Sequence, residues 1–469
     1  MTAVTVIGNG PAAHRLVQRL RERGHEGRIT VLGAEPGPAY QRALLFSVLD
    51  GTLPAAALRL PPPPPGVLPR TGAAATAVDR RRRVVRTAAG EEHRYDVLVL
   101  ATGARAVRPP LPGAGRASAP GVRSARTLAD ARPVADEPVV VAGGGLRGVE
   151  AAHALGRAGH EVTLVHPGPH PMHRLLDARA GALLAAALEA AGVGTETGRR
   201  VAAVEPGKAV LDDGRLLPAG TLLLCAGGVP DTALARAAGL AVRRGVLVDD
   251  RLRTSDPRVY AVGDCAEHPG SPAALGATLD AALEQADALA RVLTHTGPGP
   301  APPWRPAPHV VRPRLPGLDL LVAGPPGASA GDGGGRGAEE RDEHVVLSDP
   351  ARGRYGRLVL RGERLRAAVL FGLPHAAAAV GRLYREGRPV PGDRLALLLG
   401  TDGEYAGSGE LPDDAVVCQC NNVTKKAVGD AWRRGARDLR AVAAATRATT
   451  GCGSCAGLVR RVCEAAARP

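Results

Sequence analysis

The stretch "AVTVIGNGPAAHRLVQRL" at residues 3–20 decides the fold. Four of its first five residues are apolar and predict a short buried strand, and its last residues have the pattern of a helix. Between the two lies the sequence Gly8-x-Gly10-x-x-Ala13. A second apolar strand follows in "RITVLGAE" at 28–35. The stretch therefore predicts a β-α-β unit of an α/β fold with a parallel sheet.

The turn between this strand and helix has the features of a nucleotide-binding loop. Gly8 permits a tight turn, Gly10 lets the backbone approach a diphosphate, and Ala13 lets helix and strand pack closely. A diphosphate would lie at the helix N-terminus, where free N–H groups point outward. Glu35 ends the second strand, where a carboxylate binds the ribose hydroxyls of an adenosine. The alternative is a glycine-rich turn that binds nothing, but the order of strand, helix and acid favours a nucleotide.

A second copy of the pattern, Gly143-x-Gly145-x-x-Gly148, follows its own strand and opens its own helix. At the end of the next strand His166 stands where an acid would be expected. A glutamate there would favour NAD by binding the 2′-hydroxyl, whereas a histidine with Arg174 nearby leaves NADP possible. The alternative interpretation is that His166 is a solvated loop residue.

Two further turns follow apolar strands. "YDVLVLATG" ends in Ala101-Thr102-Gly103, and "VYAVGD" ends in Gly263-Asp264. Two nucleotide-binding units in one chain suggest two dinucleotides. An electron-transfer enzyme needs a bound flavin and a diffusing nicotinamide, placed so that a hydride passes between them.

With these motifs in order, residues 1–295 resemble the two-dinucleotide-binding-domain flavoprotein family. We call Gly8-x-Gly10-x-x-Ala13 the first fingerprint and Gly143-x-Gly145-x-x-Gly148 the second. The resemblance implies that the first fingerprint and Glu35 bind FAD and that the Ala-Thr-Gly turn lies against it. It also implies that Asp264 binds the ribityl chain of the flavin. The second fingerprint would bind NAD(P)H, with Glu150 near the nicotinamide.

The segment "YQRALLFS" differs from related ferredoxin reductases. These often carry a lysine shortly after an Arg-Pro-Pro-Leu segment, whereas this chain has Arg42 and Ser47 there and no lysine. Arg42 is counted among the FAD-binding candidates. How the surroundings of the flavin N5 are tuned is left open by this departure.

The chain has seven cysteines, and none precedes Cys225. Disulfide reductases of the resembled family carry a redox cysteine pair, either after the first fingerprint or as C-x-x-C in the nicotinamide domain. Cys225 and Cys265 stand isolated in sequence and are interpreted as small buried residues. Disulfide reductase and peroxidase activities are therefore not expected, and electrons must leave the flavin by another route.

The remaining cysteines gather near the end of the chain. Cys418-x-Cys420 and Cys452-x-x-Cys455 supply four thiols in two close pairs, which suit a [2Fe–2S] cluster or a tetrahedral zinc. Zinc sites more often use C-x-x-C on both sides, and unliganded thiols are the third alternative. The contexts "CQCNNVT" and "TGCGSC" resemble the bacterioferritin-associated ferredoxin-like (BFD-like) [2Fe–2S] domain. Cys463 is left over, on a predicted helix, and is interpreted as structural.

The predicted fold class is α/β, with two Rossmann-like domains, a small α+β domain and a small helical [2Fe–2S] module. The predicted FAD-binding domain comprises 1–112 and 228–296, and the NAD(P)-binding domain comprises 113–227. The α+β domain comprises 309–400 and the cluster module 414–466. The proline-rich "THTGPGPAPPWRPAP" marks a boundary, and the glycine-rich "GASAGDGGGRGAEE" predicts a mobile loop.

Composition argues against some partners. The formal net charge is +14, but nearly all of the positive charge is arginine, with lysine only at Lys208, Lys425 and Lys426. Apart from "DRRRR", the basic residues do not form a tract, and aromatic residues, 2% of the chain, do not interleave with them. This pattern is typical of a GC-rich genome and predicts no nucleic-acid partner. Without a leader or a membrane-length apolar run, we expect a cytoplasmic protein without a membrane partner.

The order of the domains resembles the N-terminal half of the assimilatory nitrite reductase large subunit. It also resembles the electron-transfer subunit of assimilatory nitrate reductase, with matches in "PAYQRALL", "HPGPHPMHRLLD" and "VYAVGDCAEH". A full nitrite reductase would continue into a sirohaem domain, which these 469 residues do not contain. We therefore expect a reductase whose partner is a nitrate or nitrite reductase catalytic subunit, above all the molybdenum nitrate reductase, or a small electron carrier.

Other functions stay open at this point. The first alternative is an NAD(P)H-dependent ferredoxin or rubredoxin reductase, which has the same chemistry and another acceptor. The second is an amine or opine dehydrogenase-type flavoprotein, against which the second fingerprint and "CQCNNV" argue. A non-enzymatic iron-handling or interaction module is disfavoured by the intact fingerprints.

Overall fold

The computed structural model describes residues 2–115, 121–270, 279–308, 310–325, 342–400, 413, 415–418, 423–449 and 455–467. The predicted mobile loop at 327–340 lies outside these residues. The chain forms two compact units, each made of three segments. The first comprises Met1–Pro109, Ser124–Pro133 and Ala226–Ala307, and the second comprises Pro110–Arg123, Val134–Cys225 and Pro308–Pro469.

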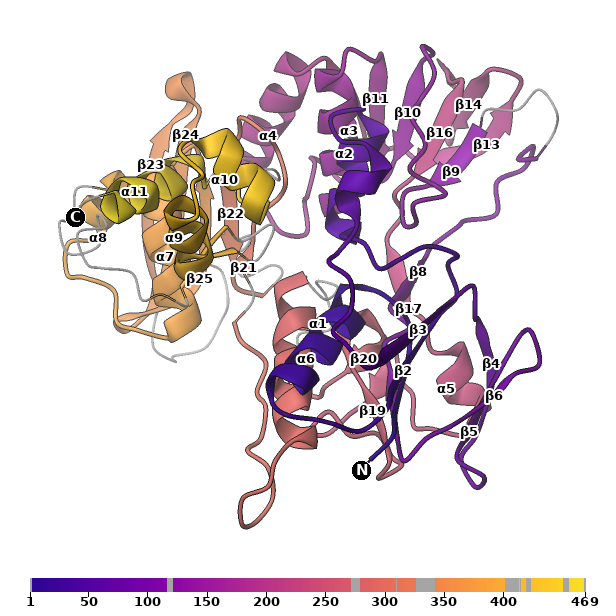
Figure 1. The fold of residues 1–469 in the computed structure, drawn as a ribbon. Coiled ribbons are helices and arrows are strands. Elements are labelled where there is room, and N and C mark those ends of the chain that lie inside the picture. Colours follow the sequence, from indigo (N-terminus) through magenta and orange to yellow (C-terminus); the bar gives the residue numbers. More distant parts are fainter. Residues whose placement is uncertain are drawn as a thin grey trace. The chain divides into compact units, whose positions relative to one another are not determined.

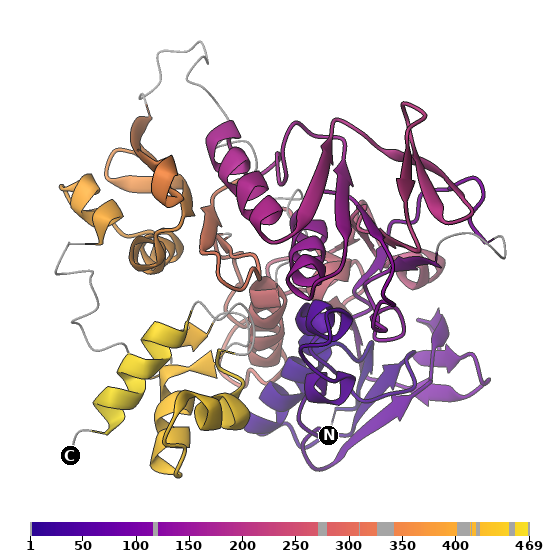
Figure 2. The same cartoon turned by 90° about the horizontal axis from the view of Figure 1, so that it is seen from above.

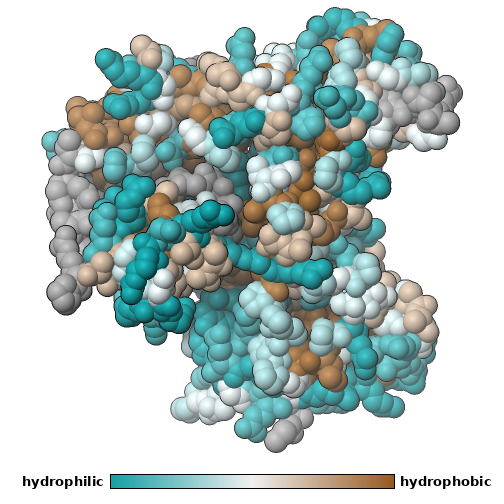
Figure 3. Space-filling model, turned by 45° about the horizontal axis from the view of Figure 1, so that its top comes forward, coloured by the Kyte–Doolittle hydropathy of each residue, from teal (hydrophilic) through white to brown (hydrophobic). Residues whose placement is uncertain are grey.

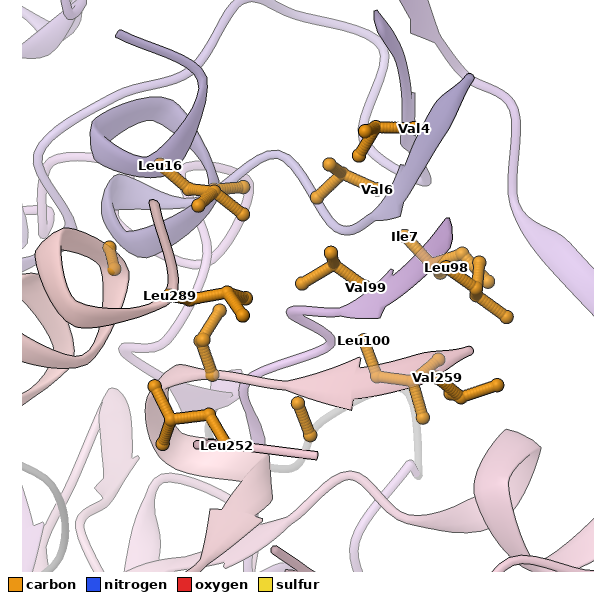
Figure 4. Close-up of a cluster of buried hydrophobic side chains, with 14 of the residues drawn as sticks. Val4, Val6, Ile7, Leu16, Leu98, Val99, Leu100, Leu252, Val259 and Leu289 are labelled. Carbon is orange, nitrogen blue, oxygen red and sulfur yellow. The ribbon is translucent and has the colours of Figure 1, made fainter. Parts of the chain in front are cut away.

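The first unit is built on a parallel sheet with the strand order β19-β7-β1-β2-β3. All four residues of β1 (Val4–Ile7) are buried, as in parallel sheets that are covered on both faces. Helices α1 (Pro11–Glu22) and α6 (Leu279–Leu293) pack side by side on it (Figure 1). Leu16 of α1 and Leu289 of α6 are fully buried and face Val99 of β7 (Figure 4).

The other elements of the first unit are short. These elements are β2 (Ile29–Gly33), η1 (Arg42–Leu44), α2 (Leu45–Leu49), η2 (Ala55–Leu58), β3 (Val67–Thr71), β4 (Ala75–Asp79), β5 (Val84–Thr87), β6 (Glu92–Arg94), β7 (Val97–Leu100), β8 (Ala104–Ala106), β17 (Gly228–Pro230), α5 (Ala233–Ala237), β18 (Val246–Leu247), β19 (Val259–Ala261), η3 (Gly263–Cys265) and β20 (Ala266–Glu267). Strands β4, β5 and β6 form an antiparallel meander.

The second unit begins with another sheet of nucleotide-binding type, in the order β12-β11-β10-β16-β9. Strands β10, β11, β12 and β16 run parallel, and β13-β14-β15 form an antiparallel meander. The elements are β9 (Gly121–Ser124), β10 (Val139–Ala142), α3 (Leu146–Arg157), β11 (Val162–His166), α4 (Ala178–Ala190), β12 (Val193–Thr197), β13 (Val201–Glu205), β14 (Lys208–Leu211), β15 (Leu216–Pro218) and β16 (Thr221–Leu224).

The same unit continues into an antiparallel sheet in the order β21-β22-β25-β24-β23. Helix α7 packs on β22 and β25, and α4 contacts β25. The elements are β21 (Val310–Val311), β22 (Leu320–Ala323), β23 (Glu343–Asp349), η4 (Pro350–Arg352), β24 (Arg354–Arg361), β25 (Arg364–Phe371), α7 (Pro374–Glu386) and α8 (Arg394–Leu399).

The last part of the chain is a small helical module with its own core of Val428, Val442 and Val459. Helices α9 and α11 pack against each other, as Figure 2 shows in yellow. The elements are β26 (Val416–Cys418), β27 (Val423–Thr424), α9 (Lys425–Arg433), α10 (Leu439–Thr446) and α11 (Ala456–Ala466).

The proline-rich segment before residue 309 is anchored to the first unit. Trp304 is buried against His268, with ring centroids 5.3 Å apart. The backbone N–H of Trp304 donates to the Asp250 carbonyl at 2.6 Å. This segment therefore packs as part of the first unit up to Ala307.

Hydrophilic and hydrophobic residues are interspersed on the molecular face drawn in Figure 3. Within the described part of the chain, no helix combines the length and apolar character needed to cross a bilayer. The parallel sheets with helices confirm the predicted α/β fold class.

Candidate cofactor sites

The first fingerprint turn depends on glycine for two reasons. Gly8 has a φ of +112°, which L residues rarely adopt, and a Cβ there would overlap the carbonyl oxygen of Ala101. Helix α1 has Gly10 at its N-cap, and no side chain caps it. Ala13 is fully buried where α1 meets the sheet. The helix N-terminus is therefore free of a side-chain cap, as a diphosphate site requires.

Glu35, Tyr40 and Arg42 form one polar cluster beside this turn. The Tyr40 hydroxyl donates to Glu35 Oε2 at 2.8 Å and accepts from Arg42 Nη1 at 2.7 Å. Arg42 also pairs with Glu35, and its guanidinium lies 4.7 Å from the centre of the Tyr40 ring. Arg42 Nε lies 3.6 Å from the place of a Cβ on Gly10. Arg42 therefore stands next to both the fingerprint and the acid.

Tyr40 is a residue that the sequence analysis missed. Its hydroxyl also accepts from the backbone N–H of Leu128 at 3.1 Å, and its side chain is buried. Burial raises the pKa of Tyr40, so the hydroxyl stays protonated and can donate. The quoted "YQRALL" contains this tyrosine, but nothing in the local pattern indicates that it reaches Glu35.

The Ala-Thr-Gly turn is held from two sides. The N–H of Ala101 donates to the Ile7 carbonyl at 2.8 Å, which places the turn beside the end of β1. The Thr102 hydroxyl donates to the Asp231 carbonyl at 2.7 Å, and the Asp231 N–H donates to the Gly103 carbonyl at 2.8 Å. These bonds fix the predicted FAD-facing turn next to Gly8.

The Gly-Asp turn is fixed by a buried glutamine. Gly263 has a φ of +76°, and its N–H donates to Gln285 Oε1 on α6 at 2.7 Å. Asp264 Oδ2 lies 3.7 Å from Arg126 Nη2, and both groups are partly exposed. A Cβ on Gly263 would lie 3.3 Å from the Ala12 side chain, so the turn meets the start of α1. Gln285 and Arg126 were not predicted from the sequence.

The second fingerprint repeats the geometry of the first. Gly143 has a φ of +124°, and a Cβ on Gly148 would overlap the Gly143 carbonyl oxygen. Gly145 caps α3 without any side-chain hydrogen bond. The turn and the helix N-terminus therefore fit the diphosphate of a second dinucleotide.

Glu150, predicted near the nicotinamide, is only 4% exposed and lies on α3. Its Oε1 accepts the backbone N–H of Arg314 at 2.8 Å. The carboxylate therefore ties the fingerprint helix to the segment between β21 and β22. No local sequence pattern indicates this contact.

His166 is not a solvated loop residue, because it is 1% exposed. Its ring lies against Gly144, where a Cβ would lie 2.5 Å from the ring Cγ. Neither ring nitrogen has a hydrogen-bond partner among the described residues. Burial lowers the pKa of His166 to about 4, so the ring is neutral at pH 7. Its role toward a nucleotide stays a prediction.

The cysteine pairs are described in part. Cys418 ends β26 and Cys455 precedes α11, and both are buried in the core of the helical module. Cys420 and Cys452 lie outside the described residues. Buried thiols in one small core fit a ligand set for a cluster that water does not reach. Cys463 lies on a helix, as predicted, and is buried on α11.

The described residues form two uncapped glycine turns before helices and a small cysteine-containing module, the arrangement expected of a dinucleotide-dependent reductase. Residues 2–286 match the pyridine nucleotide-disulphide oxidoreductase family, and residues 416–464 match the BFD-like [2Fe–2S] binding domain. The chain therefore belongs to the pyridine nucleotide-disulphide oxidoreductase family. These matches confirm the predicted FAD, NAD(P)H and [2Fe–2S] cofactors.

Curated relatives agree with this assignment. The chain is 30% identical to a nitrite reductase [NAD(P)H] of Bacillus subtilis over 98% of its own length and 57% of the relative. It is 30% identical to the assimilatory nitrate reductase electron transfer subunit of the same organism, over 97% and 58%. It thus spans little more than half of each. It is also 36% identical to a nitric oxide reductase FlRd-NAD(+) reductase of Aeromonas salmonicida, over 68% and 83%.

Among solved structures, the chain resembles putidaredoxin reductase in its covalent complex with putidaredoxin. The TM-score is 0.74 at 27% identity, and the match covers 87% of this chain and 99% of the other. A ferredoxin reductase of Rhodopseudomonas palustris matches with a TM-score of 0.67 at 25% identity, over 79% and 91%. Both support the α/β reductase fold.

Proposed function

We propose that this protein oxidises NAD(P)H at a bound FAD and passes the electrons through a [2Fe–2S] cluster to a nitrate- or nitrite-reducing partner. The observation that carries the proposal is the combination of two complete fingerprint turns with a separate cysteine module. No cysteine precedes Cys225, so the flavin half has no redox pair after its first fingerprint. The two Bacillus subtilis relatives, which match nearly the whole chain, favour this kind of acceptor.

Each cofactor is assigned to residues of this chain. FAD would lie at Gly8, Gly10, Ala13, Glu35, Arg42, Ala101, Thr102, Gly103, Gly263 and Asp264. NAD(P)H would lie at Gly143, Gly145, Gly148, Glu150 and His166, and the cluster at Cys418, Cys420, Cys452 and Cys455. When bound, FAD supplies hydride acceptance and the cluster supplies one-electron transfer.

The chain's own residues bind and orient, and no acid–base pair is needed for hydride transfer. The uncapped N-termini of α1 and α3 offer N–H groups to two diphosphates. Tyr40 and Arg42 hold the Glu35 carboxylate, and Gln285 holds the Gly263 turn. Cys418 and Cys455 are buried, so their thiols would hold the predicted cluster at the core of the helical module.

The proposal is tested by anaerobic titration of the purified protein with NADH and NADPH. We expect bleaching of the flavin absorbance by a nicotinamide nucleotide and not by amino acids, together with an electron paramagnetic resonance signal of a reduced [2Fe–2S] cluster. Absence of bleaching with both nucleotides would refute the proposal. Bleaching by an amino acid would favour the dehydrogenase alternative.

The exit route is tested with Cys418→Ser, because Cys418 is a predicted ligand. We expect flavin reduction to continue and transfer to a one-electron acceptor to be lost. Cys463→Ser is the matched control, since Cys463 is buried in the same core and is not a predicted ligand. Transfer that survives in the Cys418→Ser protein would show that electrons bypass the cluster.

A second candidate is a reductase for a small electron carrier such as a ferredoxin or rubredoxin. The similarity to the FlRd-NAD(+) reductase and to putidaredoxin reductase favours it. The two candidates differ only in the acceptor. Reduction of purified ferredoxin and rubredoxin, compared with reduction of a nitrate reductase catalytic subunit, separates them by rate.

A further inference from the structure

A buried hydrogen bond joins the nicotinamide half of the second unit to its antiparallel sheet. Asp177 precedes α4, and its Oδ1 accepts the N–H of Ala180 at 2.9 Å as the helix N-cap. Its Oδ2 accepts the hydroxyl of Tyr355 on β24 at 2.8 Å. Asp177 is 9% exposed and Tyr355 is 2% exposed. One carboxylate thus serves both the helix start and a residue far away in sequence.

The surroundings make this bond costly to lose. Arg357 Nη1 lies 3.8 Å from Asp177 Oδ2, and Arg357 is buried as well. Burial raises the pKa of Tyr355, so its hydroxyl keeps the proton that it donates. A buried carboxylate that loses a donor cannot recover it from water. The hydroxyl of Tyr355 therefore fixes the position of Asp177.

Asp177 ends the segment that leads from β11 to α4. That segment follows His166, whose ring lies against Gly144 of the second fingerprint. Midway, the N–H of Met172 donates to the Gly144 carbonyl at 2.8 Å, and Met172 has a φ of +54°. The segment is thus fastened to the fingerprint turn in its middle and to Tyr355 through Asp177 at its end.

We propose that Tyr355 is a positioning residue for NAD(P)H, although it lies on β24 of the antiparallel sheet. By holding Asp177, its hydroxyl fixes the segment 167–176 against the fingerprint turn and so shapes the adenosine end of the nucleotide site. This inference rests on the proposed binding of NAD(P)H at Gly143, Gly145 and Gly148. It gives the antiparallel sheet a part in nucleotide affinity.

The test is Tyr355→Phe in the full-length protein loaded with FAD, which removes one hydroxyl. The first readout is the Kd for ADP-ribose by calorimetry, which needs no electron transfer. We expect this Kd to rise roughly three- to tenfold. Losing a hydrogen bond to a charged group costs free energy at Asp177, and we expect only part of that cost to reach the nucleotide site. The second readout is flavin reduction, where we expect a higher Kd for NADH and an unchanged limiting rate.

Tyr384→Phe is the matched control, because Tyr384 is a partly buried tyrosine on α7 whose hydroxyl has no hydrogen bond among the described residues. Asp177→Ser is the second variant: serine still caps α4 but lacks the oxygen that accepts from Tyr355. We expect it to weaken ADP-ribose binding as Tyr355→Phe does.

Several outcomes would overturn the inference. An unchanged Kd for ADP-ribose in Tyr355→Phe would do so. If the Tm of that variant fell while the Kd stayed unchanged, the hydroxyl would be structural only. An equal rise in Tyr384→Phe would show a general effect of the domain. If the wild-type protein bound neither ADP-ribose nor NADH, the proposed function itself would fail, which is a distinct result.

Discussion

The backbone N–H of Arg314 donates a 2.8 Å hydrogen bond to the buried Glu150 carboxylate, 164 positions earlier in the chain. Only proline at 314 removes this donor, since every other residue keeps the N–H. We expect Arg314→Pro to lose about 1–3 kcal/mol of stability, because a buried carboxylate loses a partner. Thermal unfolding should show a lower Tm.

Arg314→Ala separates the backbone from the side chain in this experiment. It keeps the N–H, so a drop in Tm as large as that of Arg314→Pro would contradict the importance of the Glu150 contact. Glu150→Gln retains an acceptor oxygen for Arg314. We expect Glu150→Gln to preserve the Tm better than Glu150→Ala.

Two glycines of the second fingerprint should respond differently to alanine. A Cβ on Gly148 would overlap the Gly143 carbonyl, whereas a Cβ on Gly145 meets no atom within 4 Å. We expect Gly148→Ala to lower the Tm. Gly145→Ala should leave the Tm unchanged and raise the Kd for NAD(P)H, because the predicted diphosphate would approach there. Calorimetry and thermal unfolding of both variants check this. Equal effects on Tm would contradict it.

The buried histidines predict how stability depends on pH. Burial lowers the pKa values of His153 and His166 to about 4, below the value of about 6.5 expected for unfolded histidine. Between these values the unfolded chain binds more protons, so stability falls as the pH is lowered from 6.5 towards 4. We expect the Tm of His166→Asn to fall less between pH 7 and pH 5 than the Tm of the wild-type protein does. His295→Asn, at an exposed position, controls for the new asparagine.

The Tyr40 hydroxyl should contribute to FAD affinity. In Tyr40→Phe, Glu35 loses one donor and the N–H of Leu128 loses its acceptor. We expect the Kd for FAD, measured by quenching of flavin fluorescence on the FAD-free protein, to rise roughly tenfold. Tyr260→Phe is the control, since Tyr260 is partly buried and its hydroxyl makes no hydrogen bond among the described residues. A similar Kd for both variants would contradict the role of Tyr40.

The strands, helices and fingerprint turns were predictable because their signals are local. Gly8 and Gly143 adopt positive φ values that follow from the turn itself, and apolar runs mark the buried parallel strands. Long-range partners were not predictable. Gln285 is 22 positions from Gly263 and Arg314 is much farther from Glu150, so no spacing rule reaches either contact.

Two local environments were not predictable from the sequence, for physical reasons. The end of a strand does not reveal whether a side chain points to water, and the His166 ring lies against Gly144, whose carbonyl also accepts the N–H of Met172. From its composition, the proline-rich segment was predicted only to mark a boundary. Composition indicates how flexible a backbone can be. It does not indicate a single aromatic contact such as that of Trp304 with His268.

The interleaved segments of the first unit have a consequence for its synthesis. Strand β1 pairs with β7, but the sheet is completed only by β19 and α6, which lie roughly 250 residues later. At a synthesis rate of ~5–20 residues per second, roughly 12–50 s pass between the synthesis of β1 and that of β19 and α6. The segment Val134–Cys225 emerges in that interval and contains its own parallel sheet. The nicotinamide half can therefore fold before the flavin half, although the flavin half is started first.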